Sequence, residues 1–189
     1  DDGNQVFLST HSPLFVPMDR YEDIALVRKG TAGTRVTQTG ALVVQPDSKE
    51  YLRLINECDS QRSEMFFATR VILVEGYTER VAFPLVFKAK GIDANRQGIS
   101  VIECQGKTKI PLFVKILASL GIPFIVVHDD DTVVVDPAWP KERQDNASKH
   151  NSEHAQWNKA ITDAGTDTAR LIVLKPNFES VCGLPKRED

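Results

Sequence analysis

The sequence has few cysteines, no long apolar run and no excess of either charge. Its 189 residues include three cysteines, which lie far apart and lack the CxxC or Cys/His spacing of a zinc site. This pattern excludes a disulfide-stabilised scaffold and indicates a reducing, cytoplasmic setting. No segment approaches the roughly 18 consecutive apolar residues of a membrane span, and the first residues form no signal segment. We therefore expect no membrane partner.

The net charge of −3 excludes a polycation that binds nucleic acid over its whole surface. Any contact with nucleic acid must come from local basic patches or from bound metal ions. The composition, 41% hydrophobic and 26% charged, is typical of a globular protein of one domain or two small ones. The chain begins Asp1-Asp2-Gly3 without methionine and ends in a charged stretch, so we interpret it as a fragment of a longer protein.

The N-terminal third predicts a strand, a hairpin and a connector. The apolar run at 6–8 is typical of the end of a buried strand, and the polar residues 9–13 then form a turn. Two β-rich segments, 24–28 and 34–38, flank a Gly-containing turn and predict a hairpin. The polar segment 48–63 predicts a helix and connector, where we place a domain boundary.

From Arg70 onward, strand and helix patterns alternate. Four short apolar runs, rich in β-branched residues, predict strands buried on both faces: 71–74, 99–102, 124–127 and 171–174. Between them, helices are predicted over 78–89, with an awkward Pro84, over 109–120 and over 152–164, and the polar segment 136–151 predicts a loop. Such alternation indicates an α/β fold in which helices flank a parallel sheet.

Carboxylates follow three of these predicted strands. Glu75 and Glu79 follow the first strand, the triplet 129–131 follows the third, and Glu179 follows the fourth. Ligands of parallel sheets bind at the carboxyl ends of the strands, so these acids point to one edge. Two charges ~4 Å apart repel by about 4 kcal/mol at an effective dielectric near 20, so the acids must take up protons or hold a cation. Oxygen ligands favour Mg²⁺ or Mn²⁺ and indicate phosphate-ester chemistry.

Each acid taken alone also has a structural interpretation. Glu79 is favourable in the first turn of any helix, and Asp131 suits a turn. Jointly, Glu75 and the triplet are harder to explain in this way. Lys107 follows the second strand at the same edge and is a candidate phosphate contact, although loop lysines are mostly solvated. His128 is better interpreted as a packed residue than as a general base.

The acidic pattern resembles a known fold. The motif Val74-Glu75-Gly76-x-x-Glu79, followed by Asp129-x-Asp131, resembles the Toprim domain of topoisomerases, bacterial primases and certain nucleases. The second acid, the Pro84 helix and Asn177-Phe178-Glu179 are most similar to the OLD (overcoming lysogenization defect) nucleases. In the topoisomerases and primases a third acid often follows two residues after the DxD motif, and Val133 at that position favours the nuclease branch.

The N-terminal segment carries a second resemblance. Residues 6–13 resemble the strand and switch-histidine loop that closes an ABC-type ATPase domain, and OLD proteins join such an ATPase to a Toprim domain. The resemblance implies an ATPase end at 1–47, a connector at 48–69 and a Toprim catalytic region at 70–189, which can extend beyond Asp189. No GxxxxGK[ST] loop occurs, so ATP would act only through an ATPase core outside this chain.

The resemblance implies a metal-dependent endonuclease acting on DNA, or on RNA, through two Mg²⁺ or Mn²⁺ ions. The implied metal ligands are Glu75, Glu79, Asp129, Asp131 and Glu179, with Asp129 bridging the ions. The catalytic candidates are Glu75, Glu79, Asp129, Asp131 and Lys107. A homodimer would form through the ATPase part of the full protein. Two alternatives stay open: a topoisomerase- or primase-like activity, and a non-catalytic, metal-stabilised interaction module.

Overall fold

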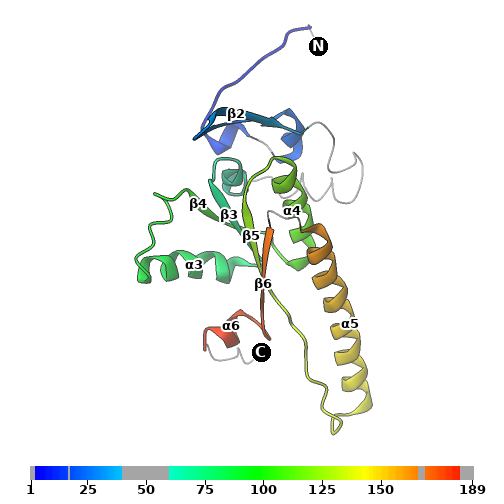
Figure 1. Ribbon diagram of the computed structural model, residues 1–189. Coiled ribbons are helices and arrows are strands. Elements are labelled where there is room, and N and C mark those ends of the chain that lie inside the picture. The colour runs from blue at the N-terminus through cyan, green and yellow to red at the C-terminus, as the bar shows by residue number, and fades with distance from the viewer. Residues whose placement is uncertain (1–2, 17, 40–59, 166–168, 184–189) are drawn as a thin grey trace. The chain divides into compact units, whose positions relative to one another are not determined.

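The chain falls into two compact units, residues 1–67 and 68–189. The computed structural model describes residues 3–16, 18–39, 60–165 and 169–183 (Figure 1). Most of the connector predicted at 48–63 lies outside the described residues; its described end is helix α2 (Ser60–Ser63). No helix in the described ranges is both long enough and apolar enough to cross a membrane.

The first unit contains the predicted hairpin. Strands β1 (Ala25–Gly30) and β2 (Gly33–Gln38) pair antiparallel, with Val27 opposite Val36 and Gly30 opposite Gly33. Gly33 has a φ of 120°, a conformation that favours glycine, where the two-residue turn enters β2. The predicted hairpin is therefore confirmed. Three short 3₁₀ helices complete the described part of this unit: η1 (Pro13–Phe15), η2 (Met18–Asp23) and η3 (Glu64–Phe66).

The buried strand predicted at 6–8 is wrong. This segment has no regular secondary structure, and Val6 and Phe7 are 88% and 91% exposed. A strand needs a neighbour to bond its N–H and C=O groups. No described strand pairs with these residues, and apolar composition alone cannot replace that partner.

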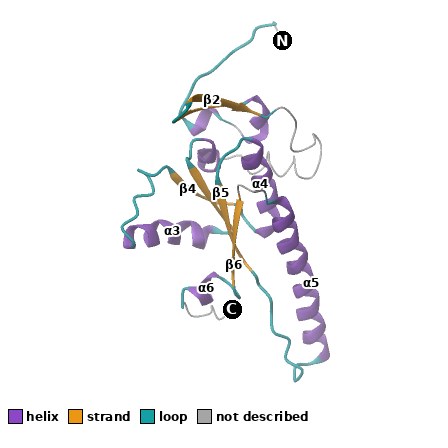
Figure 2. Cartoon of the chain, in the orientation of Figure 1, coloured by secondary structure: helices purple, strands orange, loops and turns teal. Residues whose placement is uncertain are grey.

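The second unit is built on a four-stranded parallel sheet, as predicted (Figure 2). The prediction that all four strands are buried on both faces is wrong for the run at 171–174, which forms an edge strand with Ile172 and Val173 exposed. The strand order is β4-β3-β5-β6. Val74 of β3 lies beside Val127 of β5, so both strands end at nearly the same level. Asp129, the last residue of β5, lies beside Leu174 of β6. The strands are β3 (Arg70–Val74), β4 (Ile99–Glu103), β5 (Phe124–Asp129) and β6 (Ala169–Leu174).

Helices flank this sheet (Figure 1). Helix α3 (Tyr77–Ala89) contacts β4 and continues through Pro84, and helix α4 (Ile110–Ser119) contacts β3 and β5. The helices predicted over 78–89 and 109–120 are thereby confirmed. Six apolar side chains of α4 are buried, which anchors the helix on the sheet, and Gly121 after it takes a φ of 63°. The last helix of the described residues is α6 (Phe178–Val181).

Helix α5 (Lys141–Ala164) is longer than the sequence suggests. The loop predicted over 136–151 is wrong from Lys141 onward, and the helix predicted from Ser152 begins at Lys141 instead. Ile161 is the one buried residue of α5, so the helix carries almost no apolar periodicity. Pro140 directly precedes the first turn of α5 and is the sequence signal for the start of the helix, which apolar periodicity does not indicate.

Candidate metal centre

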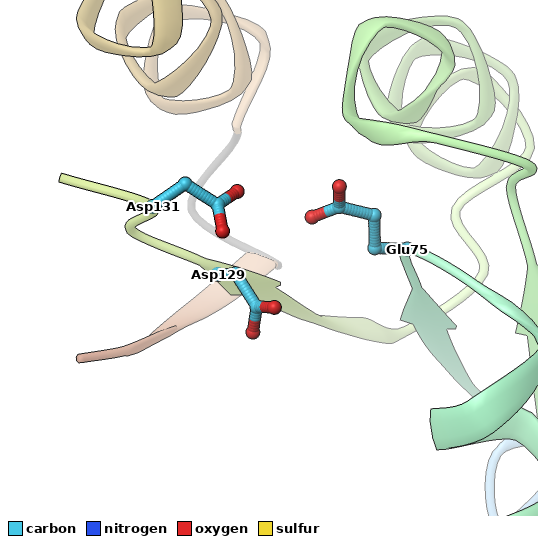
Figure 3. Close-up of side chains that lie close together, drawn as sticks. All are labelled: Glu75, Asp129 and Asp131. Carbon is cyan, nitrogen blue, oxygen red and sulfur yellow. The ribbon is translucent and has the colours of Figure 1, made fainter. Parts of the chain in front are cut away.

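Three carboxylates meet at the carboxyl edge of the sheet. Glu75 directly follows β3, Asp129 ends β5, and Asp131 comes two residues later. One oxygen from each lies within 4.8 Å of the others. Figure 3 shows the carboxylates of Glu75 and Asp131 directed toward each other, with Asp129 beside them. The structure thus brings together three of the acids that the sequence placed at this edge.

The end of β6 and the residues just after it hold the acidic segment, residues 129–131, in place. The backbone N–H groups of Asp130 and Asp131 donate to the carbonyls of Leu174 and Pro176, each at 2.8 Å. Asp131 has a φ of 60°, a left-handed conformation that aspartate tolerates better than most residues. The position of the Asp131 carboxylate therefore depends on a turn that is fixed from the neighbouring strand.

Burial and mutual repulsion raise the pKa values of two of these acids. The pKa of Asp129 rises to about 7, chiefly through burial, then through the charges of Asp131, Glu75 and Glu79. Its Oδ1 accepts a hydrogen bond of 2.9 Å from the N–H of Phe178, which opposes this rise. Burial also raises the pKa of Glu75, while the Lys107 ammonium lowers it. The centre is therefore unfavourable when all its acids are ionised and no cation is bound.

Lys107 lies inside this centre rather than in solvent. Its side chain is 2% exposed, and Nζ donates to Asp131 Oδ2 at 2.6 Å. The second strand does bring Lys107 to the predicted edge, but the contact formed there is with a carboxylate. Its contact with a phosphate stays a prediction.

Sequence reasoning missed His154 of α5. Its Nδ1 lies 3.2 Å from Asp131 Oδ2 and 3.3 Å from Lys107 Nζ. Burial lowers the pKa of His154, so the ring is neutral at neutral pH. The sequence does contain a signal for this face of α5. Four polar or aromatic residues recur at helical spacing and therefore lie on one side of a helix: His150, His154, Trp157 and Asn158. Because the region has no apolar periodicity, the sequence did not predict a helix over its first half, and this face was missed.

The comparisons with known proteins agree with this geometry. Residues 66–131 match the family described as "Overcoming lysogenization defect protein-like, TOPRIM domain". The chain carries a Toprim domain of the OLD family. The matched region runs from just before β3 to Asp131 and so contains all three carboxylates of the Toprim centre.

Two curated relatives are named as nucleases. The "OLD nuclease" of Thermus scotoductus is 33% identical over 190 residues, covering 97% of this chain and 35% of the relative. The "Old nuclease" of Escherichia phage P2 is 27% identical over 134 residues, covering 69% of this chain and 23% of the relative. The chain therefore spans about a third or less of the length of these relatives.

Two solved structures are also similar. The C-terminal region of the Burkholderia pseudomallei OLD protein matches 60% of this chain and 56% of its own, with 26% identity and a TM-score of 0.40. The C-terminal region of the Xanthomonas campestris OLD protein, phased with platinum, matches 61% of this chain and 54% of its own, with 25% identity and a TM-score of 0.40.

Two predicted ligands lie outside the three-carboxylate group of the Toprim centre. Glu79 is buried, and its Oε2 accepts a 3.0 Å hydrogen bond from the N–H of Gly76 at the start of α3. Its charge nevertheless helps to raise the pKa of Asp129. Glu179 is half-buried in the first turn of α6, next to the residue whose N–H binds Asp129. The metal-binding roles of both acids stay predictions.

The Toprim centre fits a divalent cation. Its three carboxylates offer only oxygen, and Oε2 of Glu75 is buried with no hydrogen-bond partner among the described residues. Ligand oxygens lie about 2.1 Å from a Mg²⁺ ion, so three oxygens within 4.8 Å of one another share one ion once their side chains turn closer together. A bound cation would satisfy the unpartnered oxygen and offset the repulsion that raises the pKa of Asp129.

Proposed function

We propose that this Toprim domain is the catalytic region of a Mg²⁺- or Mn²⁺-dependent endonuclease that hydrolyses phosphodiester bonds, most directly those of DNA. The observation that carries the proposal is the convergence of Glu75, Asp129 and Asp131 in a domain whose relatives are named OLD nucleases. Clustered carboxylates at a sheet edge are suited to hold the ions that bring a phosphate and an attacking water together.

In this proposal the three carboxylates hold the ions directly. Glu79 and Glu179 would supply further oxygens from the first turns of α3 and α6, and Asp129 would serve as a ligand of both ions. Divalent ions held there would supply the positive charge that favours proton loss from the attacking water and stabilises the leaving oxygen. Oxygen donors favour Mg²⁺ or Mn²⁺ over softer metals.

The residues of the chain contribute charge and orientation. Phe178 N–H donates to Asp129 Oδ1, which leaves the other oxygen of Asp129 for a cation. Lys107 lowers the repulsion among the acids because its ammonium lies 2.6 Å from Asp131. His128 is 2% exposed, and its Nδ1 donates to the backbone oxygen of Asp129 at 2.9 Å. Burial lowers its pKa, which suits support of the β5 end better than proton transfer with substrate.

Supercoiled plasmid incubated with the chain and Mg²⁺ or Mn²⁺ tests the proposal. We expect nicked and linear products, which Asp129→Asn abolishes and Asp145→Asn, at an exposed position of α5, does not. Relaxed closed circles would instead indicate strand passage. Unchanged plasmid, together with unchanged Mn²⁺ affinity of Asp129→Asn, would indicate a non-catalytic module.

The wider organisation belongs to the same proposal. We infer an ATPase end at 1–47 and a connector at 48–69 ahead of the Toprim region 70–189, with ATP acting only through an ATPase core outside this chain. A homodimer formed through that ATPase part and a cytoplasmic setting are further predictions. Size-exclusion chromatography with light scattering on the full-length protein tests the dimer.

A further inference from the structure

Polar contacts rather than apolar packing hold α5 to residues 130–139, which lie between β5 and α5. Three amide side chains of α5, spaced seven residues apart, donate to backbone carbonyls of the 130–139 segment. The pairs are Gln144 with Trp139 at 2.7 Å, Asn151 with Val133 at 2.8 Å, and Asn158 with Asp130 at 3.2 Å. These contacts therefore hold the side chains on this face of α5 at a fixed distance from the carboxylates of the Toprim centre.

His154 lies on that face between two of the amides. Its side chain is 15% exposed, and its ring packs against His150 and Trp157, with centroid separations of 4.1 and 4.6 Å. Nδ1 is directed at the ion pair of Asp131 and Lys107, at 3.2 and 3.3 Å. Ring packing limits rotation of the imidazole, so this contact is built into the fold.

The contact persists in either neutral tautomer. With a proton on Nδ1, the ring donates to Asp131 Oδ2; without it, Nδ1 accepts from Lys107 Nζ. In both cases His154 binds one member of the pair and restrains the other through it. Oδ2 of Asp131 is thereby held, while the carboxylate faces Glu75 (Figure 3).

We propose that His154 is a positioning residue that holds the Asp131–Lys107 pair and so keeps the Asp131 carboxylate turned toward Glu75 and Asp129. The inference rests on the proposed function, because it assigns His154 an effect on cation binding. Residues that hydrogen-bond a metal-ligating group orient it, and their loss typically weakens metal affinity by about 10- to 100-fold.

Substitution of His154 in the 189-residue chain tests this role. We expect His154→Phe to weaken Mn²⁺ binding, measured by calorimetry, by at least about tenfold. His154→Asn places an amide close to the position of Nδ1, so it should stay within about threefold of wild type. His154→Gln carries the amide one carbon farther out and should behave like the phenylalanine variant. The asparagine–glutamine pair carries the test if His154→Phe does not fold.

His150→Phe is the matched control. His150 Nε2 binds the backbone oxygen of Asp131 at 3.0 Å and does not contact the carboxylate. We expect this variant to keep its Mn²⁺ affinity within about threefold. For His154→Phe, plasmid cleavage should lose kcat, with KM changed less than about twofold. Equal weakening by both phenylalanine variants, or no recovery by His154→Asn, would overturn the positioning role.

Asp129→Asn separates this inference from the proposed function. If that variant binds Mn²⁺ as well as wild type, the metal centre itself is refuted. If Asp129→Asn loses Mn²⁺ binding while His154→Phe retains it, the metal centre stands and the role of His154 is refuted.

Discussion

Asp129→Asn should stabilise the metal-free chain at alkaline pH, although it removes a proposed catalytic group. The folded pKa of Asp129 is about 7, against an ordinary value of 3.8. A raised carboxyl pKa means that the folded state binds more protons than the unfolded state between these values, so stability falls as pH rises from about 4 to 7. The asparagine side chain carries no charge and can still accept the hydrogen bond from Phe178.

The size of this effect follows from the pKa shift. About three pKa units correspond to about 4 kcal/mol at 1.36 kcal/mol per unit. Asp129 is only half-buried, so solvent screening reduces the expected gain to about 2 kcal/mol at pH 8. Near pH 4 wild-type Asp129 is protonated, and the variant should then have nearly the same stability as wild type.

Thermal unfolding in EDTA, followed by circular dichroism at pH 4.5 and pH 8, measures this difference. For a chain of this size, about 2 kcal/mol corresponds to an increase in Tm of roughly 4–8 °C at pH 8. Asp145→Asn removes an exposed carboxylate that pairs with Lys141 at 3.0 Å, and it should change stability by less than about 0.5 kcal/mol. If Asp129→Asn is no more stable than wild type at pH 8, the raised pKa of Asp129, and the burial and repulsion that cause it, are refuted.

Three further outcomes are expected. Glu75→Gln should lower the Mn²⁺ affinity measured by calorimetry by more than about tenfold, because it removes a charged ligand. Oε2 of Glu75 is buried and has no hydrogen-bond partner among the described residues. Unchanged affinity would exclude Glu75 as a ligand. Gly98→Ala should destabilise the chain in urea by about 1–2 kcal/mol more than Gly91→Ala, because both glycines have positive φ but only at Gly98 would a Cβ clash with the Thr69 side chain. Equal losses would show that Thr69 gives way. Leu117→Ala should cost about 2–5 kcal/mol in the same assay, whereas Leu85→Ala, at a side chain 64% exposed, should cost far less.

The parts of the fold that burial determines could be predicted from the sequence. The runs of β3 and β5 are short and β-branched, and most of their residues are buried, while α4 shows its buried face through helical periodicity. The edge strands β4 and β6 carry the same kind of run with far less burial: only Ile102 of β4 is buried, and Ile172 and Val173 of β6 are exposed. The parts of the fold that polar contacts determine could not be predicted from the sequence. The N-terminal half of α5 is bound through Gln144 and Asn151 to backbone carbonyls, and such contacts leave no apolar pattern in the sequence.

The same division explains how much of the candidate site could be predicted. Glu75, Asp129 and Asp131 were placed together because parallel topology alone brings the ends of β3 and β5 to one edge. The contacts of Lys107 and His154 depend on the left-handed turn at Asp131 and on the packing of α5, which no local pattern encodes.

These contacts also explain why the acids can lie so close together. Three ionised carboxylates and one buried ammonium leave two negative charges, which balance one divalent cation, so the second ion of the proposed function needs the further acids Glu79 and Glu179. Burial first, and then the charges of Asp131, Glu75 and Glu79, raise the pKa of Asp129 to about 7, so its ionisation is unfavourable when no cation is bound. A second buried lysine would satisfy the acids and remove the reason to bind a metal, whereas one lysine holds Asp131 in place and leaves the centre in need of a cation. We therefore expect Lys107→Met to make the metal-free chain less stable than wild type at pH 8, because the carboxylates lose the ammonium beside Asp131, and a variant whose Tm in EDTA at pH 8 equals that of wild type would contradict this account.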